Sequence, residues 1–367
     1  MNMLLAVVCG VLCLGGAVDD RAAPAAMIET ARLEASIRGL PTKRAARGDV
    51  AHQKGLLETE ALLELWLKDL GYTPRRLPLT WNLKYQADEE KKAGVPESQQ
   101  APETNAGLAE RTWHNIVVEL PGKTLPKEVL ILACHFDAVP GAPGADDNGT
   151  GVAALLEIAR VLKGVPMERT VRMIFFNLEE VGLRGSMEYV KRDLPKDEKV
   201  IGMVSLEMLG YFTDAPNSQR SPIGKIEGVF DPPTVGDFIA IATIQKFSEF
   251  ARRLDAEMRA AAPGLKTVVA DFMPVAPPDF LRSDHAPFML TGKPGVMLTD
   301  TSNFRNPHYH KPTDTIETLD MERFTLVVRG VAGAAHAIAG PIPPAPKAPG
   351  ANEKPRTGEA RGDGSGK

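Results

Sequence analysis

Short apolar runs alternate with amphipathic stretches along most of the chain, and this alternation predicts an α/β fold. The runs HNIVVELPG, EVLILACHFD, RTVRMIFFNLEE and VIGMVSLEM are rich in β-branched and apolar residues and are bounded by turn residues. FIAIAT and GVMLTD have the same character later in the chain. Strands that are apolar nearly throughout are typical of a largely parallel sheet covered on both faces. We therefore expect a three-layer α/β/α sandwich around a central mixed, mainly parallel sheet.

Other stretches have apolar residues at helical spacing. In HQKGLLETEALLELWLKDLGY, one helical face carries Leu56, Leu63, Leu67 and Leu70, and Gly71 stands where a helix commonly ends. Further helices are expected at the stripe Val152, Leu155, Ala159 and Leu162, at residues 245–262, and at residues 320–339 before Gly340. Helices that alternate with apolar strands in this way cover the two faces of the predicted sheet.

The pattern runs without an internal repeat, so we expect a single domain at residues 51–340. Residues 18–50 are expected to form an N-terminal segment, and the polar stretch 86–111 a loop excursion from the domain. The Pro-rich stretches 214–236 and 271–284 are expected to be long loops. Long loops in a compact domain often form the walls of a site.

The two ends of the chain differ from the domain in composition. Residues 1–17, MNMLLAVVCGVLCLGGA, combine a short apolar stretch with small residues that suit a signal peptidase. We expect a cleaved signal peptide and export to the periplasm or the extracellular space, although the charge-free start leaves a retained anchor open. Residues 341–367 consist of Pro, Gly, Ala and charged residues, which bury too little apolar surface to order, so a disordered tail is expected.

Composition and charge narrow the class of protein. Charged residues make up 25% and hydrophobic residues 43%, which is ordinary for a globular protein, and the net charge of -4 gives no reason to expect nucleic-acid binding. After residues 1–17 no apolar run approaches the ~18 residues of a membrane span. Cys134 is the cysteine left after removal of the signal, so no internal disulfide is expected. Cys134 should point away from His135 into the core.

Potential metal ligands follow several of the predicted strands. The strand ends and the loops after them carry His135, Asp137, Asp146, Asp147, Asn148, Glu179, Glu180, Glu207, His308 and His310. Taken singly, an H-x-D, an Asp-Asp-Asn-Gly turn or a Glu-Glu pair is ordinarily a structural or surface feature. Ligands of open α/β sheets, however, bind beyond the carboxyl ends of the strands, where these residues gather. Imidazole nitrogens and carboxylate oxygens are ligands that zinc accepts.

The number of candidate ligands is enough for two ions that share one site. Two ions ~3.5–4 Å apart need a bridging carboxylate between them. The candidate ligands are His135, Asp147, Glu180, Glu207 and His310. Glu179 is then left over as a base. Asp137, two residues from His135, is placed to accept the ring N–H of that histidine and to fix its tautomer.

The runs CHFDAVPGAPGADDNGTGVAALLE, NLEEVGLRGS, SLEMLGY, SDHAPF and HKPTDT resemble the two-zinc aminopeptidase family. That family includes bacterial secreted leucyl aminopeptidases, aminopeptidase Y and the glutamate carboxypeptidase II branch. The resemblance covers residues 110–340 with every motif in order. It implies that residues 51–340 form a zinc peptidase catalytic domain, with two zinc ions per chain.

The resemblance also implies a role for each residue. Asp147 would bridge the two zinc ions, Glu180 and His310 would complete the first, and His135 and Glu207 the second. Glu179 would act as general base and then as general acid. The peptide bond between Asp147 and Asn148 would be cis.

The chain departs from the family's usual pattern at a few positions. Glu207 stands where the family usually has aspartate, so the strand should sit farther back or the second ion should bind differently. Phe280 stands where some members place a tyrosine hydroxyl near the transition state. His310 rather than His308 has the family's spacing to Asp314. His285, in the Ser-Asp-His sequence, is expected to be a site-wall or structural histidine.

The function that follows is a metal-dependent exopeptidase that removes N-terminal residues from peptides with a free N-terminus. A water that bridges the two zinc ions would give its proton to Glu179, which would return it to the leaving amine. The alternatives are a carboxypeptidase-like or other amide hydrolase, a glutaminyl cyclase-like enzyme, and a binding protein on an inactive scaffold. The cyclases keep a single zinc, and inactive scaffolds lose ligands, so His135 and Glu207 together argue against both. The pattern leaves the specificity pocket, the physiological metal and the oligomeric state open.

Overall fold

The computed structural model describes residues 22–79, 81, 91 and 112–342. The predictions for the signal peptide at 1–17, for nearly all of the polar loop at 86–111 and for the tail after residue 342 lie outside the described residues. Within the described part of the chain, no helix is both long enough and apolar enough to cross a membrane.

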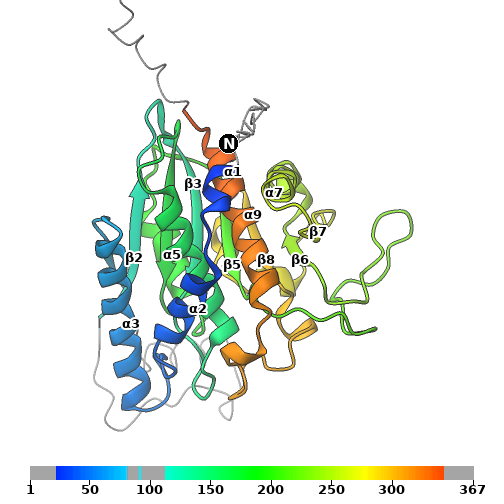
Figure 1. Ribbon diagram of the computed structural model, residues 1–367, viewed down its shortest axis with the longest axis horizontal. Helices are drawn as coiled ribbons and strands as arrows, with labels where there is room; N and C mark the ends of the chain where they lie inside the picture. Colours follow the sequence, from blue (N-terminus) through cyan, green and yellow to red (C-terminus); the bar gives the residue numbers. More distant parts are fainter. Residues whose placement is uncertain (1–21, 80, 82–90, 92–111, 343–367) are drawn as a thin grey trace, which may run out of the picture.

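A single eight-stranded sheet forms the centre of the molecule, in the order β1-β2-β4-β3-β5-β8-β6-β7 (Figure 1). The strands are β1 Arg75–Leu79, β2 Trp113–Leu120, β3 Leu125–His135, β4 Arg169–Phe176, β5 Lys199–Glu207, β6 Ile239–Ala242, β7 Thr267–Ala270 and β8 Gly295–Thr299. The four central strands β4, β3, β5 and β8 run parallel, as do β6 and β7. The pairs β1–β2, β2–β4 and β6–β8 are antiparallel. The predicted mixed, mainly parallel sheet is confirmed.

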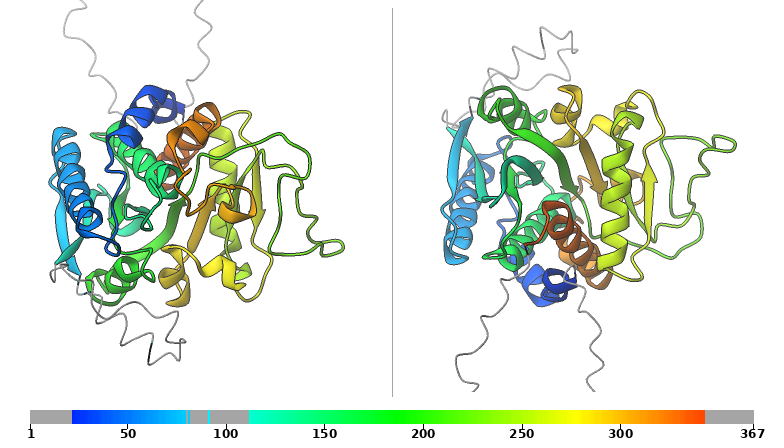
Figure 2. Two further views of the ribbon diagram at one scale, coloured as in Figure 1. Left: turned by 90° about the horizontal axis from the view of Figure 1, so that it is seen from below. Right: turned by 90° about the horizontal axis from the view of Figure 1, so that it is seen from above.

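Helices cover both faces of this sheet, as predicted (Figure 2). One face is covered by α1 Ala22–Ala26, α2 Thr30–Gly39, α3 Val50–Asp69, α5 Gly151–Leu162, α7 Ser248–Ala261 and α9 Met321–Ala339. The opposite face carries the shorter α6 Arg184–Glu188 and α8 His285–Leu290. The result is a three-layer arrangement in a single domain.

Alternate residues of the central strands enter two different apolar cores. In β3, Leu130, Leu132 and Cys134 pack into the larger core with α5 and α9, whereas Ile131 and Ala133 pack into the smaller core on the other face. A strand with both faces buried has no polar side to present to water, which is why its sequence is apolar throughout. Cys134 is buried and free, as expected from its position beside His135.

The helix predictions agree with the structure in their buried faces and in their ends. In α3, Leu56, Leu63 and Leu67 are fully buried. The Asp49 side chain accepts the backbone N–H of His52 at the start of α3, and Gly71 takes a positive φ of 80° just after its end. Positive φ is strained for residues with a Cβ atom, so glycine suits this helix end.

The strands that the sequence pattern did not predict are the two edges of the sheet. β1 carries Arg75, Arg76 and Pro78, and its N-terminal residues are exposed. β7 is four residues long, and three of its residues are half-buried. Charged residues and a proline interrupt the apolar pattern of β1, as is common at a sheet edge. In β7 the apolar run is only three residues long, Val268 to Ala270, which is too short to mark a strand by itself.

The N-terminal segment also contains helices that were not predicted. α1 packs against α9, and α2 packs against α5 and α9. Leu33 and Ile37, four residues apart on α2, are buried in the larger core. That spacing was the available signal for a helix.

Candidate metal centre

The predicted site residues meet where the central parallel strands end. His135 is the last residue of β3, Glu207 is the last residue of β5, and Glu179 and Glu180 follow β4 by three and four residues. These strands are neighbours in the sheet, so their ends lie side by side. His310 comes from the segment between β8 and α9. The carboxyl edge of the sheet is therefore the location of the site.

Asp147 reaches the site from a single distorted turn, Ala145–Thr150, that leads into α5. Its φ and ψ of -104° and 88° are not helical, and the peptide bond between Asp147 and Asn148 is cis, as the resemblance implies. Gly144 precedes the turn with a positive φ of 67°. A Cβ atom at Gly144 would lie 2.4 Å from the Asp147 carbonyl oxygen, so only glycine fits there.

The carboxylate of Asp147 faces two histidines, with one oxygen toward each. Its Oδ1 lies 3.2 Å from Nε2 of His135, and its Oδ2 lies 3.1 Å from Nε2 of His310. Glu207 Oε2 is 3.5 Å from Nε2 of His135, and Glu180 Oε2 is 3.3 Å from Nε2 of His310. The five predicted ligands therefore form two groups that share Asp147, and within each group the ligand atoms lie within 4.8 Å of one another.

A third possible group contains Glu179. One atom each of His135, Glu179 and Glu180 also lies within 4.8 Å of the others. The geometry alone thus permits Glu179 as a ligand. The two groups that share Asp147 differ from this third group in having a carboxylate common to both.

Burial and mutual repulsion shape the protonation of the acidic residues. Burial, together with the nearby Glu180 and Glu207, raises the pKa of Glu179 well above its usual range. Burial and the charge of Asp147 raise the pKa of Glu180 to about 7. Although burial acts against it, the close contacts with the His135 and His310 imidazoles hold the pKa of Asp147 below its usual range.

The two histidines have raised pKa values because carboxylates lie next to them. Burial disfavours the charged imidazole, but Glu207 and Glu179 raise the pKa of His135 well above its usual value. Burial likewise opposes protonation of His310, yet its contacts with Asp147 and Glu180 raise its pKa to about 10. Protons and metal ions compete for these nitrogens, because only a neutral imidazole can bind a metal.

Asp137 contacts the site differently from the prediction. The Nδ1 atom of His135 lies 3.1 Å from the backbone carbonyl of Asp137 and 3.5 Å from its carboxylate. That carboxylate instead accepts the backbone N–H groups of Glu179 and Glu180, at 3.0 and 3.1 Å. Asp137 therefore orients the histidine through its main chain, and its side chain fixes the two glutamates.

Buried hydrogen bonds hold the remaining residues in place. The carboxylate of Asp314 accepts the backbone N–H groups of Asp146 and Asp147, which fixes the turn from the opposite side. The Ser283 hydroxyl donates to Glu207 Oε2 at 2.7 Å. Glu207 is thus oriented by a partner as well as by its strand, and such partners commonly tune the ligands of metal sites.

The histidines that were not predicted to be ligands lie away from the two groups. His308 turns its Nδ1 toward the Thr313 hydroxyl, 2.9 Å away. His285 is fully buried, and its Nε2 lies 2.7 Å from the carbonyl oxygen of Phe280, which identifies it as a structural histidine. Burial lowers the pKa of His285 to about 4.

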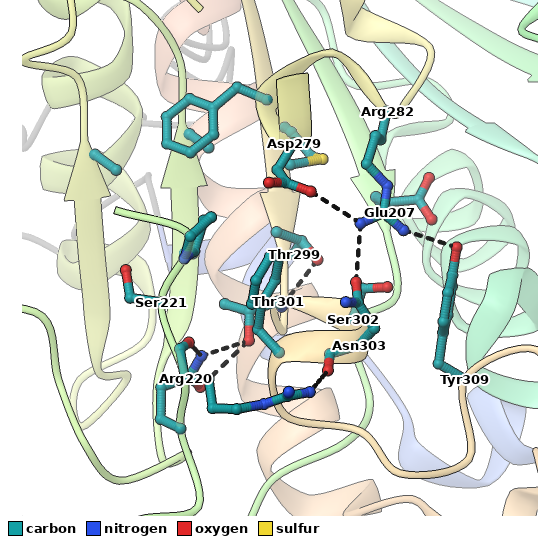
Figure 3. Close-up of a pocket in the computed structure, with 18 of the residues that line it drawn as sticks. Glu207, Arg220, Ser221, Asp279, Arg282, Thr299, Thr301, Ser302, Asn303 and Tyr309 are labelled. Carbon is teal, nitrogen blue, oxygen red and sulfur yellow. Dashed lines mark hydrogen bonds and ion pairs between the residues drawn. The ribbon is translucent and has the colours of Figure 1, made fainter. Parts of the chain in front are cut away.

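An apolar pocket opens directly beside the acidic cluster (Figure 3). With its open mouth it encloses about 970 Å³. The apolar part of its lining includes Ile223, Phe230, Phe238, Ala240, Ala242, Val268, Ala270, Phe280 and Met297. Apart from Phe238, which directly precedes β6, these residues come from β6, β7 and β8 and from the loops at 214–236 and 271–284, which were expected to form site walls. The first of these loops extends far from the body of the molecule in Figure 1.

The polar rim of the pocket was missed by the sequence analysis. Arg282 donates hydrogen bonds to the side chains of Asp279, Asn303 and Tyr309, as Figure 3 shows. The ring of Tyr309 stacks on His310 with the ring centres 3.8 Å apart. Neither contact has a signal in the sequence beyond the position of Tyr309 next to a predicted ligand.

The chain belongs to peptidase family M28. Residues 115–335 match this family, and the match spans every predicted ligand. The family resemblance stated from the motifs is thereby confirmed.

Two relatives illustrate the range of similarity. Uncharacterized protein YfbL of Escherichia coli (strain K12) is 28% identical over 274 residues, which cover 70% of this chain and 81% of YfbL. Aminopeptidase YwaD of Bacillus subtilis (strain 168) is 30% identical over 226 residues, which cover 58% of this chain and 42% of YwaD. The chain spans about half the length of the relatives that are named aminopeptidases.

Solved structures share the fold. The LapA aminopeptidase of Legionella pneumophila has a TM-score of 0.63 at 17% identity, over 88% of this chain and 75% of LapA. The glutaminyl cyclase of Porphyromonas gingivalis has a TM-score of 0.59 at 15% identity, over 85% of this chain and 99% of the cyclase. At these identities the likeness concerns the fold alone.

Proposed function

We propose that this protein is a two-zinc aminopeptidase that removes N-terminal residues from peptides. The observation that carries the proposal is the position of Asp147, whose two carboxylate oxygens face His135 on one side and His310 on the other. A carboxylate in this position would be able to bind two ions at once. Membership of a peptidase family and the names of relatives such as YwaD support the choice of peptides as substrates.

The donor atoms suit zinc. Each proposed ion has one imidazole nitrogen and carboxylate oxygens, a ligand set that zinc accepts. Two of the donor atoms, Nε2 of His135 and Oε1 of Glu180, are buried without a hydrogen-bond partner. An unpartnered buried polar atom is costly, and a bound cation would satisfy both. When bound, the zinc ions would polarise the substrate carbonyl and lower the pKa of water.

Glu179 is the proposed proton carrier. It lines the same pocket as the proposed ligands, and it is the carboxylate of the cluster that the two groups sharing Asp147 do not use. In the proposed reaction Glu179 takes a proton from the attacking water and passes it to the leaving amine. The backbone N–H of Glu179 is held by Asp137, which keeps the carboxylate directed at the site.

The acidic lining favours a substrate with a free α-amino group. Asp147, Glu179, Glu180 and Glu207 all face the pocket, and an α-ammonium beside them gains charge-assisted hydrogen bonds. The apolar walls favour an apolar side chain on the same residue. Among the lining residues, Ala242 and Ala270 have small side chains, which suits a larger side chain on the substrate.

The proposal extends to the parts of the chain that the structure leaves undescribed. Residues 1–17 would direct export to the periplasm or the extracellular space and would then be cleaved, while residues 343–367 would be a dispensable tail. The first residue of the mature protein, determined by N-terminal sequencing after export, tests the cleavage.

Glutaminyl cyclisation is the second candidate, because the cyclase of Porphyromonas gingivalis shares the fold. The cyclases keep a single zinc, whereas this chain retains both His135 and Glu207 for the second ion. Cyclisation of an N-terminal glutamine without peptide-bond cleavage would favour this alternative.

The deciding experiment compares Leu-p-nitroanilide with its N-acetyl derivative, at equal concentration and with zinc present. An aminopeptidase hydrolyses the first and leaves the second intact, because the acetyl group removes the charge and adds bulk. Equal hydrolysis of both, or cleavage within a blocked peptide, would move the assignment to a carboxypeptidase-like or other amide hydrolase.

A further inference from the structure

A buried arginine from the N-terminal segment ties together the two ends of the loop 136–144, which lies between the proposed ligands His135 and Asp147. Arg44 is 2% exposed. Its Nε donates to the carbonyl of Phe136 at 2.9 Å, its Nη1 to the carbonyl of Pro143 at 2.5 Å, and its Nη2 to the carbonyl of Gly144 at 2.5 Å. One side chain thus hydrogen-bonds the main chain at both ends of the single loop 136–144, which connects β3 to the turn Ala145–Thr150.

The positions of these carbonyls matter for the site. Phe136 directly follows His135, and Gly144 lies three residues before Asp147. The guanidinium group is planar and its N–H groups point in fixed directions, so it sets the separation of the carbonyls that it binds. Arg44 therefore fixes the distance between the loop of one ligand and the turn of the shared ligand.

The charge of Arg44 is not used in an ordinary ion pair. Among the described residues no carboxylate lies within ion-pair distance of it, and its hydrogen bonds go to carbonyl groups. Burial lowers the pKa of Arg44, while Asp314 and Asp147 act in the opposite direction. A buried charge of this kind is costly to desolvate, and the carbonyl dipoles offset that cost.

The main chain around Arg44 is itself firmly held. The carbonyl of Arg44 accepts the backbone N–H of Ala138 at 2.9 Å, and Gln53 of α3 donates to the carbonyl of Ala46. The segment passes so close to α3 that a Cβ atom at Gly55 would lie 1.8 Å from the Lys43 carbonyl oxygen. Arg44 is thus anchored to a long helix, and it lies outside residues 115–335, which match the family.

We propose that Arg44 is a positioning residue that holds the His135 loop and the Asp147 turn at the separation that the metal ions require, before any ion binds. The inference rests on the proposed metal-dependent function. A purely electrostatic role would have the opposite consequence, because a nearby positive charge repels a cation and its removal would tighten zinc binding.

The test compares zinc affinity in the full-length wild type and in the variants Arg44→Lys and Arg44→Met. Affinity is measured by competition with a chromophoric chelator, and melting temperatures are recorded in EDTA and in excess zinc. Both variants should bind zinc about 10- to 100-fold more weakly, which is typical for loss of a group that orients ligands. The rise in melting temperature that zinc produces should shrink accordingly.

Arg172→Met is the matched control. Arg172 is also buried, but it hydrogen-bonds Glu119 and Glu198, away from the proposed ligands. This variant should lower both melting temperatures by the same amount and leave zinc affinity unchanged. The inference is overturned if Arg44→Lys keeps the affinity of the wild type, if Arg44→Met binds zinc more tightly, or if either variant behaves like the control. If the wild type binds no zinc, the proposed function fails as a whole.

A measurement on the wild type decides the matter should both Arg44 variants fail to fold. Hydrogen exchange is followed at the amides of Ala138 and Gly149, which donate to the carbonyls of Arg44 and Gly144. Preorganisation by Arg44 predicts that these amides are protected in EDTA. Exchange at the rate of an unstructured chain until zinc is added would show that the metal, and not Arg44, holds the loop.

Discussion

The acidic wall of the site and its apolar wall are built in different ways. The acidic wall consists of residues at or just after the ends of central strands and of Asp147 in its turn. The carboxylates of Asp137 and Asp314 accept backbone N–H groups of this wall, and the Ser283 hydroxyl donates to Glu207. The apolar wall is formed largely by β6, by the edge strand β7 beside it and by two long loops. The exposed Val229 and Val275, 59% and 74% accessible, lie on those loops.

This difference suggests that the acidic wall carries out the reaction and that the apolar wall selects the substrate side chain. Groups that bind metal or move protons must be held within fractions of an ångström, and the interior of the sheet supplies that rigidity. A side-chain pocket tolerates adjustment, and loops can change without disturbing the sheet. We therefore expect substitutions in the acidic wall to change turnover and metal content, and substitutions in the apolar wall to change the choice of substrate.

The largest effect is expected from His310→Ala. The variant should lose zinc, and turnover should fall to the background rate, because the ligand group of Glu180 and His310 would lack its nitrogen. His308→Ala is the matched control two residues away, since His308 faces Thr313. Zinc content and turnover are measured for both variants, and loss of zinc in His308→Ala alone would reverse the assignment.

Glu179→Gln should lower turnover by about 10²- to 10⁴-fold while zinc content stays at the level of the wild type. The amide has nearly the same shape but cannot accept the proton from water. Glu180→Gln, at the neighbouring position, should instead lose zinc. If zinc is lost from Glu179→Gln and retained by Glu180→Gln, then the third ligand group, which contains Glu179, describes the metal site better.

Ala242→Phe should change specificity rather than catalytic capacity. Ala242 lies on β6 and lines the pocket, so a phenyl group there would fill the space of a large substrate side chain. The ratio of kcat/KM for Leu-p-nitroanilide to that for Ala-p-nitroanilide should fall by about 10- to 200-fold. Val229→Phe, at an exposed position of the neighbouring loop, should leave the ratio unchanged. A change in zinc content with Ala242→Phe would show that the two walls are not independent.

The smallest effect concerns how the stability of the protein depends on pH through His285, which lies behind the apolar wall at Phe280. The folded protein keeps His285 neutral with a pKa of about 4, whereas the unfolded chain has a value near 6.5. The unfolded state therefore binds the extra proton between these values, and the folded state loses up to about 3 kcal/mol as pH falls from 6.5 to 4.

His285→Gln removes this titration and keeps a donor for the Phe280 carbonyl. Urea unfolding in EDTA, from pH 7 to pH 4, should show a flatter loss of stability in the variant than in the wild type. Parallel curves for the two proteins would contradict the assignment of His285 as a buried neutral histidine.

The sequence predicted the central strands and the residues at their ends, because both have local signals. His135 and Glu207 follow apolar runs, and the position of a strand end in a parallel sheet places them on one edge. β1 and β7 had no such signal, since edge strands are not buried on both faces. The sequence analysis placed the Asp137 carboxylate against the ring of His135. In the structure the backbone carbonyl of Asp137 is the nearer partner of that ring, and residue spacing does not show which backbone groups form hydrogen bonds.

Contacts between distant segments could not be predicted. Arg44 lies about 90 residues before the loop that it binds and has no nearby carboxylate to mark it. Arg282 and Tyr309 likewise meet only in the folded chain. Such contacts depend on the paths of the loops in the folded chain, and the pattern of apolar and polar residues does not predict these paths.

The central claim is that one carboxylate, Asp147, serves two metal ions, and zinc stoichiometry tests it most directly. Zinc per chain is measured by mass spectrometry after dialysis of the wild type, Glu207→Gln and Asp147→Ala against a zinc buffer. The account predicts two ions in the wild type, one in Glu207→Gln and none in Asp147→Ala. One ion in the wild type, retained by Glu207→Gln, would contradict it.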